Sequence, residues 1–120
     1  MQYLLSIYLE ESGWSALTPA EKESIYQEYR DLVGSLVKSG NYLGGNELAP
    51  TSTATTVRVR NGKQSVTDGP FAETKEQLGG YFLVEAADLD EAIAIAGRIP
   101  SARAGSIEIR PVAPSMADGQ

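Results

Sequence analysis

The stretch "GGYFLVEAADLDEAIAIA", residues 79–96, decides the fold because it runs directly from a strand into a helix. Residues 79–86 alternate between two faces, with Phe82 and Val84 on one of them, and this period of two is typical of a strand. The letters "DLDE" at 88–91 have the spacing of a capping box, which closes the first turn of a helix. The stretch therefore predicts a strand followed by a helix.

The residues that follow complete a strand–helix–strand unit. The helix is rich in alanine and ends near Pro100, because proline disrupts a helix interior. "GSIEIRPV", residues 105–112, alternates isoleucine with polar side chains and predicts the second strand. Small side chains would let the helix approach a sheet closely. The face predicted to do so consists of Ala92, Ile93, Ala96 and Gly97.

The first third of the chain predicts a similar strand and helix. "QYLLSIYL", residues 2–9, is apolar on both faces, which is typical of a strand inside its sheet. Residues 10–17 are interpreted as a loop that carries the single tryptophan, and "TPAE" at 18–21 is a capping box with proline at the first helical position. Gly40 suits the end of this helix. Its apolar stripe consists of Ile25, Tyr29, Leu32, Val33, Leu36 and Val37.

The middle of the chain contains the clearest hairpin signal. In "TTVRVRNGKQSVTDG", residues 55–69, two valines alternate with Arg58 and Arg60. Asn61–Gly62 then tolerates the positive φ angles of a two-residue hairpin turn. Residues 42–54 before the hairpin have a weak pattern, which is interpreted as a short strand and a loop.

Together these elements predict an α+β fold: a single domain over residues 1–112 with a mobile tail at 113–120. The order is that of a ferredoxin-like βαββαβ sandwich, in which two helices cover one face of an antiparallel sheet. Its other face would be half polar. The side chains predicted to lie there are Ser6, Tyr8, Arg58, Arg60, Tyr81, Glu85, Glu108 and Arg110.

Two arrangements fit a half-polar sheet face. The face could be open to water in a monomer. Alternatively, two copies could pair face to face across a twofold axis, forming a homodimeric α+β barrel with room for a ligand. The pattern alone does not decide between the two.

Composition excludes several classes of function. The chain has 120 residues and a net charge of -6, which disfavours a nucleic-acid partner because an acidic surface repels phosphates. It has no cysteine and no histidine, so acid–base chemistry would fall to carboxylates, lysine or tyrosine, and we expect neither a metal nor a cofactor. The apolar run near the start is too short to span a membrane and lacks the basic region of a signal peptide, which predicts a cytoplasmic protein.

A polar loop joins the hairpin to the strand at 79–86. Asp68, Gly69 and Pro70 are typical turn residues, and Phe71 would insert into apolar surface. The loop could be an ordinary connection with solvated charges, or it could be the wall of a site. In the same way, Glu73 and Lys75 could form an ion pair or orient a polar ligand.

The run "DGPFAETKEQLGGY", together with "TTVRVRNGK", "YLLSIY" and "IEIRPV", resembles the DGPF-type branch of the YCII-related proteins. The resemblance covers nearly the whole chain. It implies a ferredoxin-like subunit, a dimeric α+β barrel and a bacterial cytoplasmic protein. It also implies that the gene for the protein often lies beside the gene for an extracytoplasmic-function sigma factor. A His–Asp pair has been proposed for YCII-type relatives, but it cannot exist here because the chain has no histidine.

Two functions follow as hypotheses, beside a third hypothesis in which the domain is purely structural and binds no ligand. In the first, the dimer binds a small polar or anionic metabolite beside the Asp-Gly-Pro-Phe loop, with weak acid–base chemistry by Asp68, Glu73 and Lys75. The second is a regulatory protein that contacts a sigma factor. The residues leave open whether the protein is an enzyme. The predicted ligand-binding residues are Tyr8, Arg58, Gly69, Pro70, Phe71 and Arg110.

Overall fold

The computed structural model describes residues 1–114. The tail predicted at 113–120 therefore lies outside the described residues from residue 115 onward. One four-stranded antiparallel sheet forms the body of the molecule, with the strand order β2-β5-β1-β6. Its strands are β1 (Gln2–Leu9), β2 (Tyr42–Glu47), β5 (Gln77–Glu85) and β6 (Ser106–Pro111).

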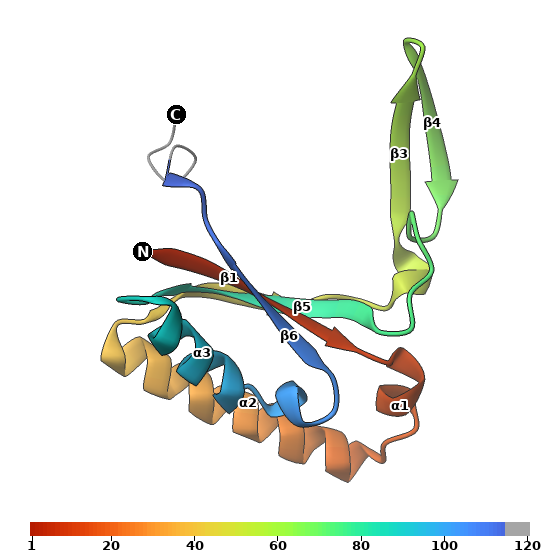
Figure 1. Cartoon of the computed structure of the whole chain (residues 1–120). Helices are drawn as coiled ribbons and strands as arrows, with labels where there is room; N and C mark the ends of the chain where they lie inside the picture. The colour runs from red at the N-terminus through yellow and green to blue at the C-terminus, as the bar shows by residue number, and fades with distance from the viewer. Residues whose placement is uncertain (115–120) are drawn as a thin grey trace.

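The two longer helices cover one face of this sheet (Figure 1). The units β1-α2-β2 and β5-α3-β6 give an α+β arrangement compatible with a ferredoxin-like fold. The prediction of a plain loop at 10–17 is wrong, because a short helix forms there. The helices are α1 (Glu11–Ser15), α2 (Pro19–Ser39) and α3 (Leu89–Arg98), with short 3₁₀ helices at Thr51–Thr53 and Pro100–Arg103.

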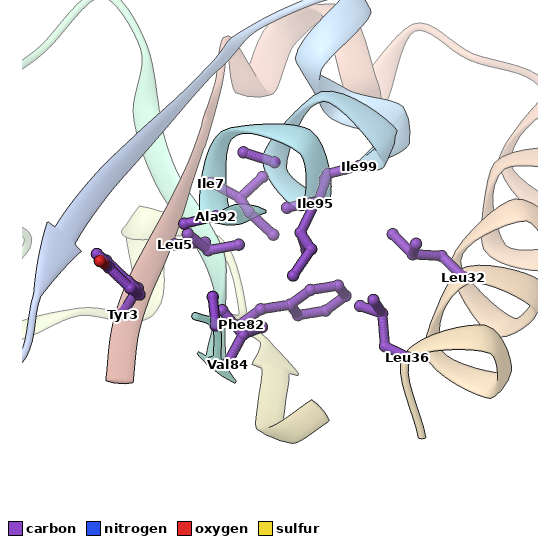
Figure 2. Close-up of a cluster of buried hydrophobic side chains, with 12 residues drawn as sticks. Tyr3, Leu5, Ile7, Leu32, Leu36, Phe82, Val84, Ala92, Ile95 and Ile99 are labelled. Carbon is purple, nitrogen blue, oxygen red and sulfur yellow. The ribbon is translucent and has the colours of Figure 1, made fainter. Parts of the chain in front are cut away.

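The hydrophobic core lies between the sheet and these helices, as Figure 2 shows. Alternate residues of the two central strands point into it, and α3 contributes side chains at steps of three and four. The predicted helix faces are partly wrong, since Val37, Ile93 and Gly97 are exposed. The largest side chains that are completely buried are Leu5, Leu36, Val84 and Ile99.

Local capping chemistry fixes the start and end of α2. The Glu21 amide donates to the Thr18 hydroxyl at 3.1 Å, and the Thr18 amide donates to the Glu21 carboxylate at 2.9 Å, which confirms the capping box. Gly40 ends the helix with a φ of 80°. At α3 only half of the predicted box forms: Asp88 accepts from the Glu91 amide at 2.9 Å.

The predicted hairpin forms, but it does not join the main sheet. Strands β3 (Thr55–Arg60) and β4 (Lys63–Asp68) make a separate two-stranded ribbon that projects on the side opposite the helices (Figure 1). We call residues 55–68 the arm. Asn61 and Gly62 have φ angles of 53° and 73°, as the turn requires. The arm also extends the molecule: the radius of gyration is 16.3 Å, against about 14 Å for a compact chain of this length.

The prediction that Arg58 and Arg60 belong to the less apolar face of the main sheet is therefore wrong. Alternation along a strand tells which residues share a face, but it does not tell which sheet the strand joins. We call the sheet face that the helices leave uncovered the open face. At its centre Leu4 lies opposite Leu83 and Arg110, and Ser6 lies opposite Tyr81 and Glu108.

Candidate functional site

A pocket of about 520 Å³ lies between the sheet and α2, on the helix side of the sheet. It is therefore on the opposite side of the sheet from the open face. Strands β2 and β5, the N-terminal half of α2 and the short helix α1 all contribute to its walls. The aromatic side chains that line it are Trp14, Tyr26, Tyr29, Tyr42 and Phe82.

Glycines in the sheet give the pocket its space. Gly45 in β2 and Gly79 and Gly80 in β5 line the pocket and place no side chain into it. A Cβ atom on Gly45 would lie 2.6 Å from Cδ1 of Phe82 and 2.7 Å from the backbone oxygen of Tyr81, so a larger residue there would displace both the ring and the strand backbone. The glycines thus leave room between this corner of the sheet and α2.

The aromatic rings pack against one another edge to face. Phe82 lies between Tyr29 and Tyr42, with ring centroids 6.1 Å and 5.6 Å away and interplanar angles of 85° in both pairs. Trp14 packs edge-on against Tyr26 at 5.4 Å. Such contacts stabilise aromatic pairs beyond the area they bury, so the lining is a fixed apolar surface.

Two tyrosine hydroxyls stand among these rings. The Tyr26 hydroxyl donates to the carboxylate of Glu47 at 2.9 Å and 3.1 Å. Burial raises the pKa of Tyr26, and the neighbouring Glu47 raises it further. The Tyr29 hydroxyl lies 2.6 Å from the hydroxyl of Ser101, and burial likewise raises the pKa of Tyr29. Both phenols therefore stay protonated at neutral pH.

Three charged side chains line the pocket, and each of them has a partner. The carboxylate of Glu11 accepts from the amide and hydroxyl of Thr51 at 2.9 Å and 3.0 Å. Arg30 forms an ion pair with Glu23. The third is Glu47, whose carboxylate accepts from Tyr26, and both carboxylates can accept further hydrogen bonds.

The structure places Asp68, Glu73 and Lys75 outside this pocket. Asp68 is exposed at the base of the arm, opposite Thr55. Glu73 and Lys75 are exposed in the loop, and no ion pair joins them among residues 1–114. The loop does reach the pocket through Gln77, a lining residue whose side-chain amide donates to the backbone oxygen of Thr74 at 2.6 Å.

The predicted ligand-binding residues are dispersed. Arg58 and Phe71 come together, with the guanidinium donating to the Phe71 carbonyl at 3.5 Å. Phe71 is 78% exposed, so the prediction that it inserts into apolar surface is wrong for the single chain. Tyr8 and Arg110 belong instead to strands of the main sheet. None of the six lines the pocket, namely Tyr8, Arg58, Gly69, Pro70, Phe71 and Arg110.

Sequence reasoning missed Glu47 and most of the aromatic lining. The available signals were the glycine pairs at 44–45 and 79–80, which are unusual inside strands, and the spacing of Tyr26 and Tyr29 on one side of α2. Within residues 1–114 there is no cluster of three or more acidic side chains that could hold a metal ion. None of the helices described here is long and apolar enough to cross a membrane.

Comparison with known proteins identifies a family and a relative. Residues 1–115 match the family model of the YCII-related domain. An uncharacterised protein of Rhizobium meliloti (strain 1021) is 39% identical to this chain over 115 residues, which cover 94% of this chain and 93% of that protein. The family match includes the main sheet, the helices, the arm and the pocket.

Proposed function

The chain belongs to the YCII-related domain family, and we propose that it binds a small organic molecule in the pocket between the sheet and α2. The aromatic lining of a space of about 520 Å³ carries this proposal. Ligand sites commonly enclose roughly 300–1,000 Å³ and combine apolar walls with a few polar groups that fix orientation.

The polar groups favour a ligand with an apolar body and a protonated amine. Glu11 and Glu47 are lining carboxylates with acceptor capacity left, and aromatic faces attract cations. Arg30, the basic lining residue, is already paired with Glu23. The anionic ligand expected from Arg58 and Arg110 would bind elsewhere, because neither arginine lines this pocket.

Trp14 makes the binding measurable, because it is the single tryptophan of the chain and lines the pocket. We expect 2-phenylethylamine to change the Trp14 fluorescence saturably at lower concentration than 2-phenylethanol, and 3-phenylpropionate to bind most weakly. The three probes share a phenyl ring and differ in charge. Glu47→Gln should reduce the preference for the amine over the alcohol.

The matched control is Asp90→Asn, which removes the same charge at an exposed position on α3 that does not line the pocket. It should leave the order of the three probes unchanged. An absence of saturable change with all three probes would contradict the binding proposal. Equal binding of amine and carboxylate would contradict the proposed ligand class alone.

For the open face we propose pairing with a second copy in a homodimer. Leu4 and Leu83 form an apolar centre there, and the same face carries both Glu108 and Arg110. A surface with an apolar centre and charges of both signs can be complementary to itself across a twofold axis. The sigma-factor partner and the acid–base roles of Asp68, Glu73 and Lys75 stay predictions.

A further inference from the structure

The arm presents an uncovered apolar stripe. Its strands pair so that Val57 lies directly opposite Val66, and Val59 follows two residues along on the same face. Val57 is 56% exposed, Val59 is 58% exposed and Val66 is 59% exposed. A two-stranded ribbon is marginally stable by itself in water, so we expect another surface to pack against this face.

The body of the same chain does not supply that surface. Figure 1 shows both strands of the arm standing clear of the sheet and of all three helices. The arm is anchored at its base, where the Gly69 amide donates to the Ala54 carbonyl at 2.7 Å and the Thr56 hydroxyl donates to the Gly69 carbonyl at 2.8 Å. Its valines therefore remain available to another molecule.

The charge of the arm indicates which molecule fits. Arg58, Arg60 and Lys63 outnumber Asp68, so the arm carries a charge of +2 within a chain whose net charge is -6. The rest of the chain therefore carries -8. A basic ribbon and an acidic body attract each other, and a second copy of this chain provides such a body.

The length of the arm adds a geometric reason. Six residues per strand give a reach of about 20 Å, and the arm projects on the side of the open face (Figure 1). Two sheets packed face to face lie about 10 Å apart. In the proposed dimer an arm of this length passes beyond the plane of the partner's sheet, so it must run alongside the partner's body.

We propose that the arm of each copy packs its valine face against the body of a second copy, so that the two arms hold the pair together reciprocally. This inference rests on the proposed homodimer and adds a specific contact to it. Arg58, Arg60 and Lys63 lie on the ribbon face opposite the valines, so they favour the approach to the acidic body at long range without contacting it. The valines stabilise the contact once it has formed.

The base of the arm allows a clean test. Because the Ala54 carbonyl and the Gly69 amide are already hydrogen-bonded, replacing residues 55–68 by Asn-Gly should close the chain with a tight turn and leave the core intact. We expect the full chain to be a dimer by sedimentation equilibrium. We expect the shortened chain to be a folded monomer. Its far-ultraviolet circular dichroism signal, divided by the number of residues in the remaining body, should be unchanged.

A second variant keeps the arm in place. Val57→Thr, Val59→Thr and Val66→Thr together retain β-branched side chains and should weaken dimerisation roughly a hundredfold, since three apolar methyl groups per arm become hydroxyls. The control is Ser65→Ala with Thr67→Ala, because both residues lie on the other face of the ribbon. It should leave the dissociation constant of the dimer unchanged.

The outcomes separate the two proposals. A dimer of unchanged affinity in the shortened chain or in the triple variant would overturn the role of the arm and leave the open-face dimer standing. A monomeric full chain at all concentrations would overturn both. In that case the valines would be left for a partner other than a second copy.

Discussion

At the scale of single residues, Tyr29 joins the pocket to the core. Its ring packs edge-on against Phe82, and its hydroxyl is hydrogen-bonded to Ser101, which is only 7% exposed. Burial raises the pKa of Tyr29. The folded protein therefore favours the protonated phenol over the phenolate.

Tyr29→Phe should lower the free energy of unfolding at neutral pH by about 1–2 kcal/mol, because the buried Ser101 hydroxyl loses its partner. The contribution of protonated Tyr29 is complete below its unfolded pKa of about 10 and is lost as the pH rises through the higher folded value. Urea unfolding between pH 8 and 11 should show the difference between wild type and variant narrowing above about pH 10.

Phenylalanine cannot ionise, so the variant itself is free of this loss at alkaline pH. Tyr26 also has a raised pKa but is present in both proteins, and its effect cancels in the comparison. A difference that stays constant or widens up to pH 11 would show that the folded state does not favour protonated Tyr29.

At the scale of elements, the sequence predicts what is encoded between near neighbours. Thr18 with Glu21, Gly40 at the end of α2, and the Asn61–Gly62 turn all act over one to four residues, and all three form. Physical rules for caps and turns suffice there, because the partners are fixed by the local backbone.

The sequence could not determine how strands and side chains that are far apart in the chain are placed relative to one another. The alternation of Val57 and Val59 indicates a strand but is equally compatible with a position in the main sheet and with a free ribbon. The pocket depends on Trp14, Tyr26 and Phe82 meeting across three elements. No local rule brings those residues together.

Gly34 and Gly105 predict opposite effects of adding a methyl group to the backbone of a helix and next to a strand. Gly34 is exposed inside α2, and a Cβ atom there meets nothing within 4 Å. Gly34→Ala should therefore raise the free energy of unfolding by about 0.5–1 kcal/mol, since alanine favours a helix. Gly105 lies just before β6, where a Cβ atom would collide with the backbone oxygen of Tyr8. Gly105→Ala should destabilise the fold by about 1–3 kcal/mol.

Both changes add the same methyl group, so each variant is the control for the other. Denaturant unfolding of the two variants beside wild type gives the comparison. A stabilising Gly105→Ala, or a destabilising Gly34→Ala, would contradict the packing described at that position.

At the scale of the whole molecule, the proposed homodimer makes stability depend on protein concentration. The folded pair is favoured over unfolded single chains by mass action, so the Tm should rise as the concentration rises from about 1 µM to 100 µM. Differential scanning fluorimetry across this range measures the effect. A Tm independent of concentration would indicate that folding and association are not coupled.

The same measurement on the variant Leu4→Glu tests the open face. A carboxylate beside Leu83, at the apolar centre of that face, would be desolvated on pairing and should remove the concentration dependence. Leu89→Glu is a suitable comparison, because Leu89 is an exposed leucine on α3, on the side of the sheet opposite the open face. It should retain the wild-type behaviour.

The hydrogen bond that closes the base of the arm, between Ala54 and Gly69, has a consequence for assembly size. Two arms give a closed dimer only if the arm of the second copy contacts the first copy across the same twofold axis. The angle at which the ribbon leaves the sheet thus decides between a finite particle and an open chain. A substitution at Gly69, whose φ of 97° suits few other residues, could re-aim the ribbon and turn a discrete pair into a growing fibre.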